Sequence, residues 1–340
     1  MHTDTLRSTA RALVAPRKGI LAADESTGTI EKRFDSIGIG SSEQTRRAYR
    51  DMLLTTPALG EHISGVILFD ETIRQTSLGG TPFAEMLGAA GIIPGIKVDT
   101  GAKALAGYAG ETVTEGLDGL RERLAEYGAL GARFAKWRAT IFCGEGQPTD
   151  YALHANAHAM ARYAALCQEA GIVPIVEPEV LMDGTHTIEA CEAATVRTLQ
   201  ALFVELADAH VDVAGSLLKV NMVLSAKDCP TQAGPFEVAE ATGRCLTANV
   251  PPEVPGIVFL SGGQSDEDAT AHLNQMNLLG PHPWELSFSY GRALQSPALK
   301  AWGGDPANVP AGQRALAHRA RMNGLARTGE YSVELEEAAA

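Results

Sequence analysis

The chain has 340 residues, of which 45% are hydrophobic and 20% charged, and its formal net charge is −13. This composition is typical of a soluble globular protein, and the acidic balance argues against nucleic-acid binding, which favours a basic surface. Residues 1–17 lack the apolar segment of a signal peptide, and no apolar run approaches the roughly 18 residues of a membrane span, so we expect a cytoplasmic protein without a membrane partner.

Short apolar runs alternate along the chain with longer segments of helical periodicity, which is typical of βα units around a parallel sheet. In chain order, the pattern predicts strand 19–24, helix 45–54, strands 65–69 and 95–99, helix 116–127, strand 134–141, helix 151–170, strand 173–177, helix 188–210, strand 216–222, helix 237–247, strand 257–261, helix 266–278 and strand 286–290. Eight strands favour a single (β/α)₈ TIM barrel over residues 1–340, with an open doubly wound sheet as the alternative. The acidic, alanine-rich segment 329–340 is expected to be a flexible tail.

Charged and hydroxyl side chains lie near the carboxyl ends of most of these strands, where buried parallel strands are normally apolar. They are Asp24, Lys97, Asp99, Lys136, Arg138, Glu177, Glu179, Lys219, Asn221, Ser261 and Ser289. One such residue alone is often a loop residue or an ion-pair partner. The whole set indicates a functional site at the mouth of the barrel, because burying so many charges without a use is costly. Residues two apart share a face, so we expect Lys219 and Asn221 to point the same way.

Two segments have the character of anion sites. Ser261-Gly262-Gly263 precedes a helix that starts near Asp266, and Arg292 follows the eighth strand, so backbone N–H groups, a helix end and a guanidinium can meet a phosphate there. The segment from Ser26 to Thr29 begins a helix that carries Arg33, although helix capping by Ser26 or Thr27 would explain the same residues. Two anion sites imply a bisphosphate substrate.

The sequence predicts neither a metal nor a cofactor. His154 and His158 are four apart on a predicted helix but lack the glutamate of an HExxH motif, and the five cysteines contain no CxxC pair. Side chains must then supply the chemistry, and a lysine in an apolar setting can be a nucleophile that forms an imine with a ketone. Lys97, Lys136 and Lys219 are all candidates, and the apolar neighbours of Lys219 favour it.

Several long motifs closely resemble class I fructose-bisphosphate aldolase, in the same order, from about residue 16 to residue 302. They are GILAADESTG at 19–28, GIKVD at 95–99, FAKWR at 134–138, IVEPE at 175–179, LLK at 217–219, FLSGGQS at 259–265 and FSYGRAL at 288–294. The resemblance implies a (β/α)₈ barrel, usually a homotetramer, that cleaves fructose 1,6-bisphosphate reversibly to dihydroxyacetone phosphate and glyceraldehyde 3-phosphate.

The resemblance also implies roles for individual residues. It makes Lys219 the Schiff-base lysine, Glu177 the acid/base of imine formation, Asp24 the acceptor of the C4-hydroxyl proton, Lys136 a supporting cation and Glu179 a supporting carboxylate. It places Ser261, Gly262, Ser289 and Arg292 at the C1-phosphate and Ser26, Thr29, Arg33 and Lys97 near the C6-phosphate; Gly263 and Arg138 complete the predicted substrate-binding set.

Three departures from the family pattern are visible: Val220 replaces a proline, Thr29 a common serine, and the chain lacks the terminal tyrosine of the animal enzymes. Three alternatives stay open. Another Schiff-base barrel enzyme, such as a transaldolase-like or keto-acid lyase, needs one anion site and not two. A non-enzymatic binding role conflicts with the intact charged set, and a metal-dependent aldolase would be sensitive to chelation.

Overall fold

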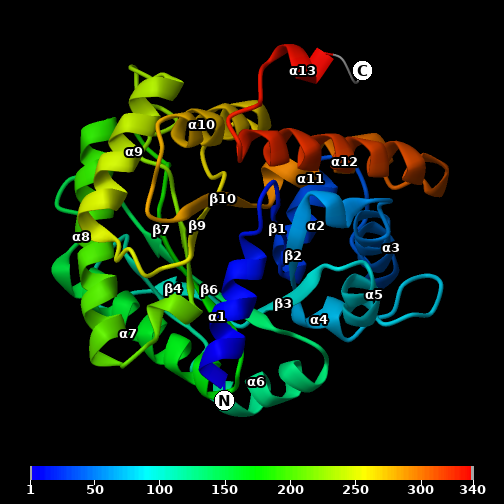
Figure 1. Ribbon diagram of the computed structural model, residues 1–340, viewed down its shortest axis with the longest axis horizontal. Helices are drawn as coiled ribbons and strands as arrows, with labels where there is room; N and C mark the ends of the chain where they lie inside the picture. Colours follow the sequence, from blue (N-terminus) through cyan, green and yellow to red (C-terminus); the bar gives the residue numbers. More distant parts are fainter. Residues whose placement is uncertain (1, 338–340) are drawn as a thin grey trace.

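The computed structural model describes residues 2–337, in which eight parallel strands close into a barrel surrounded by helices (Figure 1). The barrel strands are β1 (Gly19–Ala23), β2 (Ile63–Leu68), β3 (Ile93–Lys97), β6 (Phe134–Ile141), β7 (Val173–Val180), β8 (Leu217–Val220), β9 (Gly256–Phe259) and β10 (Glu285–Tyr290). Because β1 pairs with both β2 and β10, the sheet has no edge. The predicted (β/α)₈ barrel is confirmed and the open sheet is excluded.

Each of the six helical segments predicted by range corresponds to a helix, and the structure has further helices that were not predicted. The helices are α1 (His2–Leu13), α2 (Thr27–Asp35), α3 (Glu43–Leu54), α4 (Asp70–Ile73), α5 (Phe83–Ala89), α6 (Leu120–Ala129), α7 (Asp150–Glu169), α8 (Ile188–Asp208), α9 (Pro235–Asn249), α10 (Asp266–Leu278), α11 (Arg292–Trp302), α12 (Val309–Ala326) and α13 (Glu334–Glu337). Helix α6 begins four residues later than predicted, because Gly116 and Gly119 have φ of 130° and 63°, outside the helical region. None of the helices within residues 2–337 combines the length and apolar character needed to cross a bilayer.

The barrel interior is apolar at the amino-terminal ends of the strands. Inward-facing residues there form one cluster with helix α1, which closes this end: Leu6, Ala10, Leu13, Val14, Ile20, Ala22, Ile67, Phe134, Val173, Ile175, Leu217 and Val258. Glycines make the close packing possible, since a Cβ at Gly95 would lie 2.3 Å from the ring of Phe134 and one at Gly256 would lie 2.6 Å from Val14. Such distances exclude any side chain at either position.

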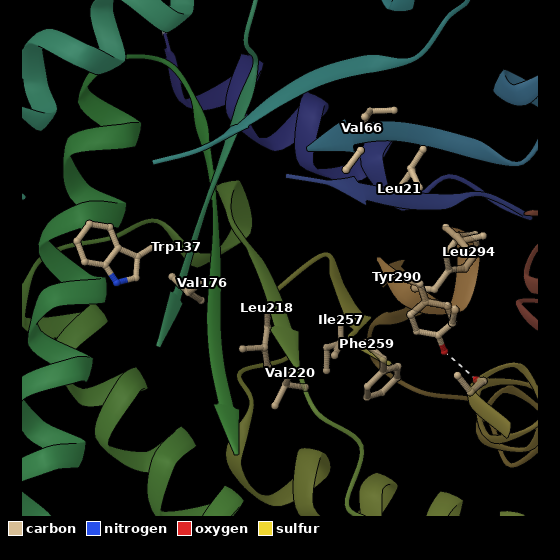
Figure 2. Packing of buried hydrophobic residues seen from close by; sticks show 14 of the residues in the cluster. Leu21, Val66, Trp137, Val176, Leu218, Val220, Ile257, Phe259, Tyr290 and Leu294 are labelled. Atoms are coloured by element: carbon tan, nitrogen blue, oxygen red, sulfur yellow. Dashed lines mark hydrogen bonds between the residues drawn. The ribbon is translucent and has the colours of Figure 1, made fainter. Parts of the chain in front are cut away.

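The alternate, outward-facing strand residues pack against the helices in a second and larger cluster. Figure 2 shows part of this layer, with side chains such as Trp137, Val176, Leu218 and Phe259 from neighbouring strands. Tyr290 satisfies its buried hydroxyl by donating to the carbonyl of Ala269 at 2.8 Å. Because both faces of most strands are buried, the strands read as largely apolar runs in the sequence, and most of their charged residues lie toward the carboxyl ends.

Two features differ from the sequence expectation. The loop after β3 forms an antiparallel hairpin, β4 (Gly101–Ala104) and β5 (Thr112–Glu115), that was not predicted. The segment expected to be a tail makes specific contacts as far as residue 336: Tyr331 is 7% exposed and its N–H donates to Asn274, while Glu336 pairs with His318 and Arg319 of α12. These contacts fix the segment because they satisfy buried polar groups on both sides. Residues 338–340 of the expected tail lie outside the described residues.

Candidate active site

A cavity of about 720 Å³ opens at the carboxyl ends of the strands, within the size range of small-molecule sites. Every residue given a catalytic or substrate-binding role by the family resemblance lines it, except Gly263: Asp24, Ser26, Thr29, Arg33, Lys97, Lys136, Arg138, Glu177, Glu179, Lys219, Ser261, Gly262, Ser289 and Arg292. Of the other strand-end residues singled out in the sequence, Asp99 and Asn221 do not line it. Others lining it were not among the predicted set: Glu25, Lys32, Ser36, Gln295, Ser296 and Lys300. The residues come from segments almost 270 positions apart, brought together by barrel closure.

Strand alternation explains why these charges face inward. Lys219 is two residues beyond the inward-facing Leu217, Glu177 is two beyond Ile175, and Lys136 is two beyond Phe134. Each strand therefore carries an apolar residue toward the closed end and a polar one toward the cavity, on the same face. Asn221 does not follow this rule: β8 ends at Val220, and the Asn221 side chain turns into the wall between β7 and α8. The prediction that it shares the face of Lys219 is wrong.

Lys136 lies at the centre of a buried charge network. Its Nζ is 2.7 Å from Asp24 Oδ2 and 3.2 Å from Glu177 Oε2. Burial alone would lower the pKa of Lys136, but Asp24 and Glu177 outweigh burial and hold the pKa above its ordinary value. Lys136 therefore stays an ammonium, without the lone pair that a nucleophile needs.

Glu177 lies between two lysines, with Oε1 at 3.1 Å from Lys219 Nζ and Oε2 facing Lys136. Burial acts to raise the pKa of Glu177, yet the charges of Lys136 and Lys219 lower it below its ordinary value. In the same way, burial of Asp24 is outweighed by Lys136 and Lys219, and the pKa of Asp24 is lowered. Both carboxylates are thus ionised at neutral pH and able to accept protons.

The three candidate lysines differ in their partners. Lys97 Nζ is 2.6 Å from Asp99 Oδ1 and donates to the Asp99 carbonyl at 2.7 Å, so a single residue binds it twice. Lys136 binds two carboxylates, whereas Lys219, which is only 4% exposed, pairs within residues 2–337 with Glu177 alone. Geometry therefore favours Lys219 as the amine that can be released for attack. Arg138, also in the cavity wall, is ion-paired with Glu179.

The segment after β1 contains the anion site that was predicted from Ser26 to Thr29. Ser26 occupies the N-cap position of α2, but its side chain makes no capping bond and instead lies 3.1 Å from Thr29 Oγ1. The capping explanation therefore does not account for this hydroxyl pair, which faces the cavity. Arg33 pairs with Glu25, and a Cβ at Gly291 would lie 3.7 Å from its Nη2. Arg33 thus lies between the two predicted phosphate sites, and not only beside Ser26.

The other predicted anion site, with Ser261 and Arg292, lies between β9, β10 and the helices that follow them. Ser289 is 1% exposed, and its Oγ has no hydrogen-bond partner within residues 2–337 although it borders the cavity. A Cβ at Gly262 would approach Glu179 Oε1 to 2.9 Å, so a side chain there would displace the Glu179 carboxylate. Helix α11 begins at Arg292, which places both a guanidinium and a helix amino terminus at this site.

Two expectations for this loop need correction. Gly263 adopts φ of 81° and packs against Met182, where a Cβ would lie 2.5 Å from the methionine side chain, so it shapes the turn and does not line the cavity. Helix α10 begins at Asp266 as predicted, but Ser265 caps it and its first turn carries Asp266, Glu267 and Asp268. These carboxylates already complement the amino-terminal end of α10, whereas the first turn of α11 carries no acidic residue.

Sequence reasoning missed a buried network behind the cavity. Glu25 pairs with Arg33 and with Arg50 of α3, at 2.6 Å for the latter, and accepts from Gln295 of α11 at 2.9 Å. Gln295 in turn accepts from Tyr49 at 3.0 Å. Glu25 follows the catalytic candidate Asp24 directly and so had a weak signal. Arg50 and Gln295 had none, because helical periodicity does not reveal which polar residue faces a distant partner.

The histidines examined as metal ligands lie on the surface. His154 and His158 of α7 each place Nδ1 3.0 Å from one oxygen of Glu205 on α8, and both are more than half exposed. In the part of the chain that the structure describes, no three His, Cys, Asp or Glu side chains gather as a metal-binding group.

Comparisons with known proteins identify the family of the chain. The family model of class-I fructose-bisphosphate aldolase matches residues 5–340. A probable class 1 fructose-bisphosphate aldolase of Xanthomonas axonopodis is 59% identical over 332 residues, covering 97% of this chain and 99% of its own, and a cytoplasmic isozyme of Pisum sativum is 52% identical over 332 residues, covering 97% and 92%. The fructose-bisphosphate aldolase of Plasmodium falciparum, solved with TRAP and a small-molecule inhibitor, superposes with a TM-score of 0.96 at 48% identity, over 97% of this chain and 96% of that one. The chain therefore belongs to the class-I fructose-bisphosphate aldolase family.

Proposed function

We propose that this protein cleaves fructose 1,6-bisphosphate reversibly to dihydroxyacetone phosphate and glyceraldehyde 3-phosphate, through an imine on Lys219. The observation that carries the proposal is the placement of Glu177, which reaches Lys219 Nζ with one oxygen and the permanently charged Lys136 with the other. The test is turnover of fructose 1,6-bisphosphate in a coupled assay for triose phosphates. Turnover of single-phosphate ketoses alone would favour another Schiff-base lyase.

Imine formation uses Lys219 and Glu177. Glu177 Oε1 accepts a proton from Lys219 Nζ, and the free amine attacks the C2 carbonyl carbon of the ketose to give a carbinolamine. Glu177 then returns a proton to the C2 hydroxyl, which leaves as water, and the C2–N bond becomes a protonated imine. Lys136 stabilises the ionised form of Glu177 between these transfers. The protonated imine is the electron sink for the next step.

Carbon–carbon cleavage requires a base near the C4 hydroxyl. Asp24 is ionised and held by Lys136 at 2.7 Å, which suits it to accept that proton as the C3–C4 bond breaks. The aldehyde product leaves, and the electron pair of the broken bond forms an enamine with the imine carbon. Protonation at C3 and attack by water at C2 then release dihydroxyacetone phosphate and restore the Lys219 amine. Glu179 and Arg138 form an ion pair in the cavity wall, which holds both side chains in place during this reaction.

The phosphates are assigned to the two anion sites. Ser261, Gly262, Ser289 and Arg292 surround the C1-phosphate, and Ser26, Thr29 and Lys97 receive the C6-phosphate. The guanidinium of Arg33 lies beside Gly291, between the two phosphate sites. The unpartnered and buried hydroxyl of Ser289 supports the C1 assignment, because such a group normally has a hydrogen-bond partner.

Arg292→Ala should lower kcat/KM for fructose 1,6-bisphosphate by about ten- to hundredfold, since a charge-assisted contact to a non-reacting phosphate is lost. Arg292→Lys should recover part of the loss, as lysine offers a point charge and not a planar fork. Steady-state kinetics with and without a C1-phosphate on the substrate measure the effect. Equal losses with both substrates would show that Arg292 only supports the β10 loop.

Exhaustive chelation with EDTA should leave turnover unchanged. The protonated imine on Lys219 accepts the electron pair that a divalent metal would otherwise stabilise. The measurement is kcat before and after dialysis against the chelator, with zinc added back to a portion of the sample. Loss of turnover that zinc restores would show a metal-dependent aldolase.

We further propose a homotetramer in the cytoplasm, formed from one barrel domain per chain. The cytoplasmic assignment follows the name of the Pisum sativum relative, and the tetramer follows the usual assembly of the family. Sedimentation velocity of the purified protein measures the mass of the assembly directly.

A further inference from the structure

The hydrogen-bonded ladder between β7 and β8 stops before it reaches the active site. The two strands pair only at Ile175 with Leu217 and at Val176 with Leu218. On its other side, β7 stays paired with β6 to its last residue, Val180. Glu177 and Lys219 each follow the last β7–β8 pair, so the two side chains that must meet stand on strands no longer joined by their backbones.

A proline explains why the ladder ends there. Successive N–H groups of a strand point to opposite sides. The N–H of Leu181 donates to Ile141 on the β6 side, whereas the N–H of Val180 points the other way, to Asn221 beyond the end of β8. Residue 178 faces the same side as Val180, and Pro178 has no N–H to donate.

Asn221 bridges the gap with its side chain. Its Oδ1 accepts from the N–H of Val180 at 2.9 Å, and its Nδ2 donates to Thr195 Oγ1 on α8 at 3.2 Å and to the Met222 carbonyl at 3.0 Å. The residue is 1% exposed and does not line the cavity. A buried amide that uses both its acceptor and its donors fixes its partners in direction as well as distance.

We propose that Asn221 is a positioning residue, which ties the carboxyl end of β7 to β8 and α8 and so holds the Glu177 carboxylate within reach of Lys219 Nζ. This inference rests on the proposed function. Misplacement of a reacting group by about 1 Å can cost on the order of 10²-fold in rate. The phosphate site of Ser289 and Arg292 belongs to β10 and α11, which the Asn221 contacts do not reach.

The experiment compares Asn221→Leu, which keeps the volume but loses every hydrogen bond, with Thr242→Val as a matched control. Thr242 is equally buried, and its Oγ1 accepts from the Val223 N–H at 2.9 Å, so it anchors the same segment to α9 without touching β7. Thr195→Val, which removes a single anchor of the amide, is the milder variant and decides the question if Asn221→Leu does not fold.

The readouts are the single-turnover rate of the borohydride-trappable adduct with dihydroxyacetone phosphate, kcat, and the inhibition constant of inorganic phosphate. Asn221→Leu should slow adduct formation and lower kcat by about 10²-fold with phosphate inhibition unchanged. Thr195→Val should show the same pattern more weakly, and Thr242→Val should lower Tm but keep the wild-type rate. Unchanged adduct formation in folded Asn221→Leu, or equal slowing by Thr242→Val, would overturn the inference. A wild-type protein that forms no adduct would instead contradict the proposed function.

Discussion

Replacing Lys219 by arginine should abolish turnover of fructose 1,6-bisphosphate, with a loss of about 10⁶-fold, as when other enzymes lose a covalent nucleophile. Arginine keeps a positive charge beside Glu177, so the ion pair and the fold are maintained, but a guanidinium stays protonated and cannot attack a carbonyl. The measurement is kcat together with binding of inorganic phosphate, which should persist.

Lys97→Arg is the control for this result. Lys97 also lies in the cavity as a partly buried cation paired with a carboxylate, but its proposed role is phosphate binding. The Lys97→Arg variant should have a higher KM for the substrate and keep most of the wild-type kcat. Substantial turnover by Lys219→Arg, or a complete loss with Lys97→Arg, would place the nucleophile elsewhere.

Glu177→Gln should lower kcat by about 10²- to 10⁴-fold, the usual contribution of general acid–base catalysis. Glutamine has nearly the same shape but cannot accept a proton from Lys219 or return one to the leaving hydroxyl. Lys136 would still be held by Asp24 at 2.7 Å, so the network is weakened and not destroyed. Steady-state kinetics test this, with single-turnover trapping to show that imine formation is the slowed step.

The same variant has a predicted signature in acid stability. Because the folded-state pKa of Glu177 is lowered, its ionised form stabilises the fold above the pKa of the unfolded chain, and this contribution is lost as pH falls through the folded-state pKa. Glu177→Gln should therefore unfold with a weaker dependence on acidification than wild type. Thermal denaturation between neutral and acid pH measures it, and an unchanged slope would show that Glu177 is not ionised in the native state.

Strand periodicity predicted which way several charged strand residues point. Residues two apart on a strand share a face, so Lys136 and Arg138 were expected in the same cavity, and both line it. The rule failed at Asn221, because it holds only while the chain stays extended and β8 ends at Val220. Asn221 is informative, because its side chain joins β7 to α8 beyond the point where Pro178 has no N–H to donate to β8.

Contacts between distant segments were not predictable from the sequence alone. Glu25, Arg50 and Gln295 form one network although they lie on three helices or loops far apart in the chain. Nothing in local periodicity distinguishes Arg50, which is 3% exposed, from an ordinary surface arginine of α3. The tail shows the same limit, because its acidic composition suggested solvent exposure, whereas Glu336 finds two basic partners on α12.

Borohydride reduction in the presence of dihydroxyacetone phosphate, followed by peptide mapping, tests the central claim most directly. Reduction converts the imine into a stable secondary amine, so the modified lysine keeps the mass of the bound ketose. We expect the adduct on the peptide that contains Lys219, with none formed in the absence of the ketose. An adduct on the peptide of Lys136 or Lys97, or no adduct in a protein that turns over its substrate, would contradict the account.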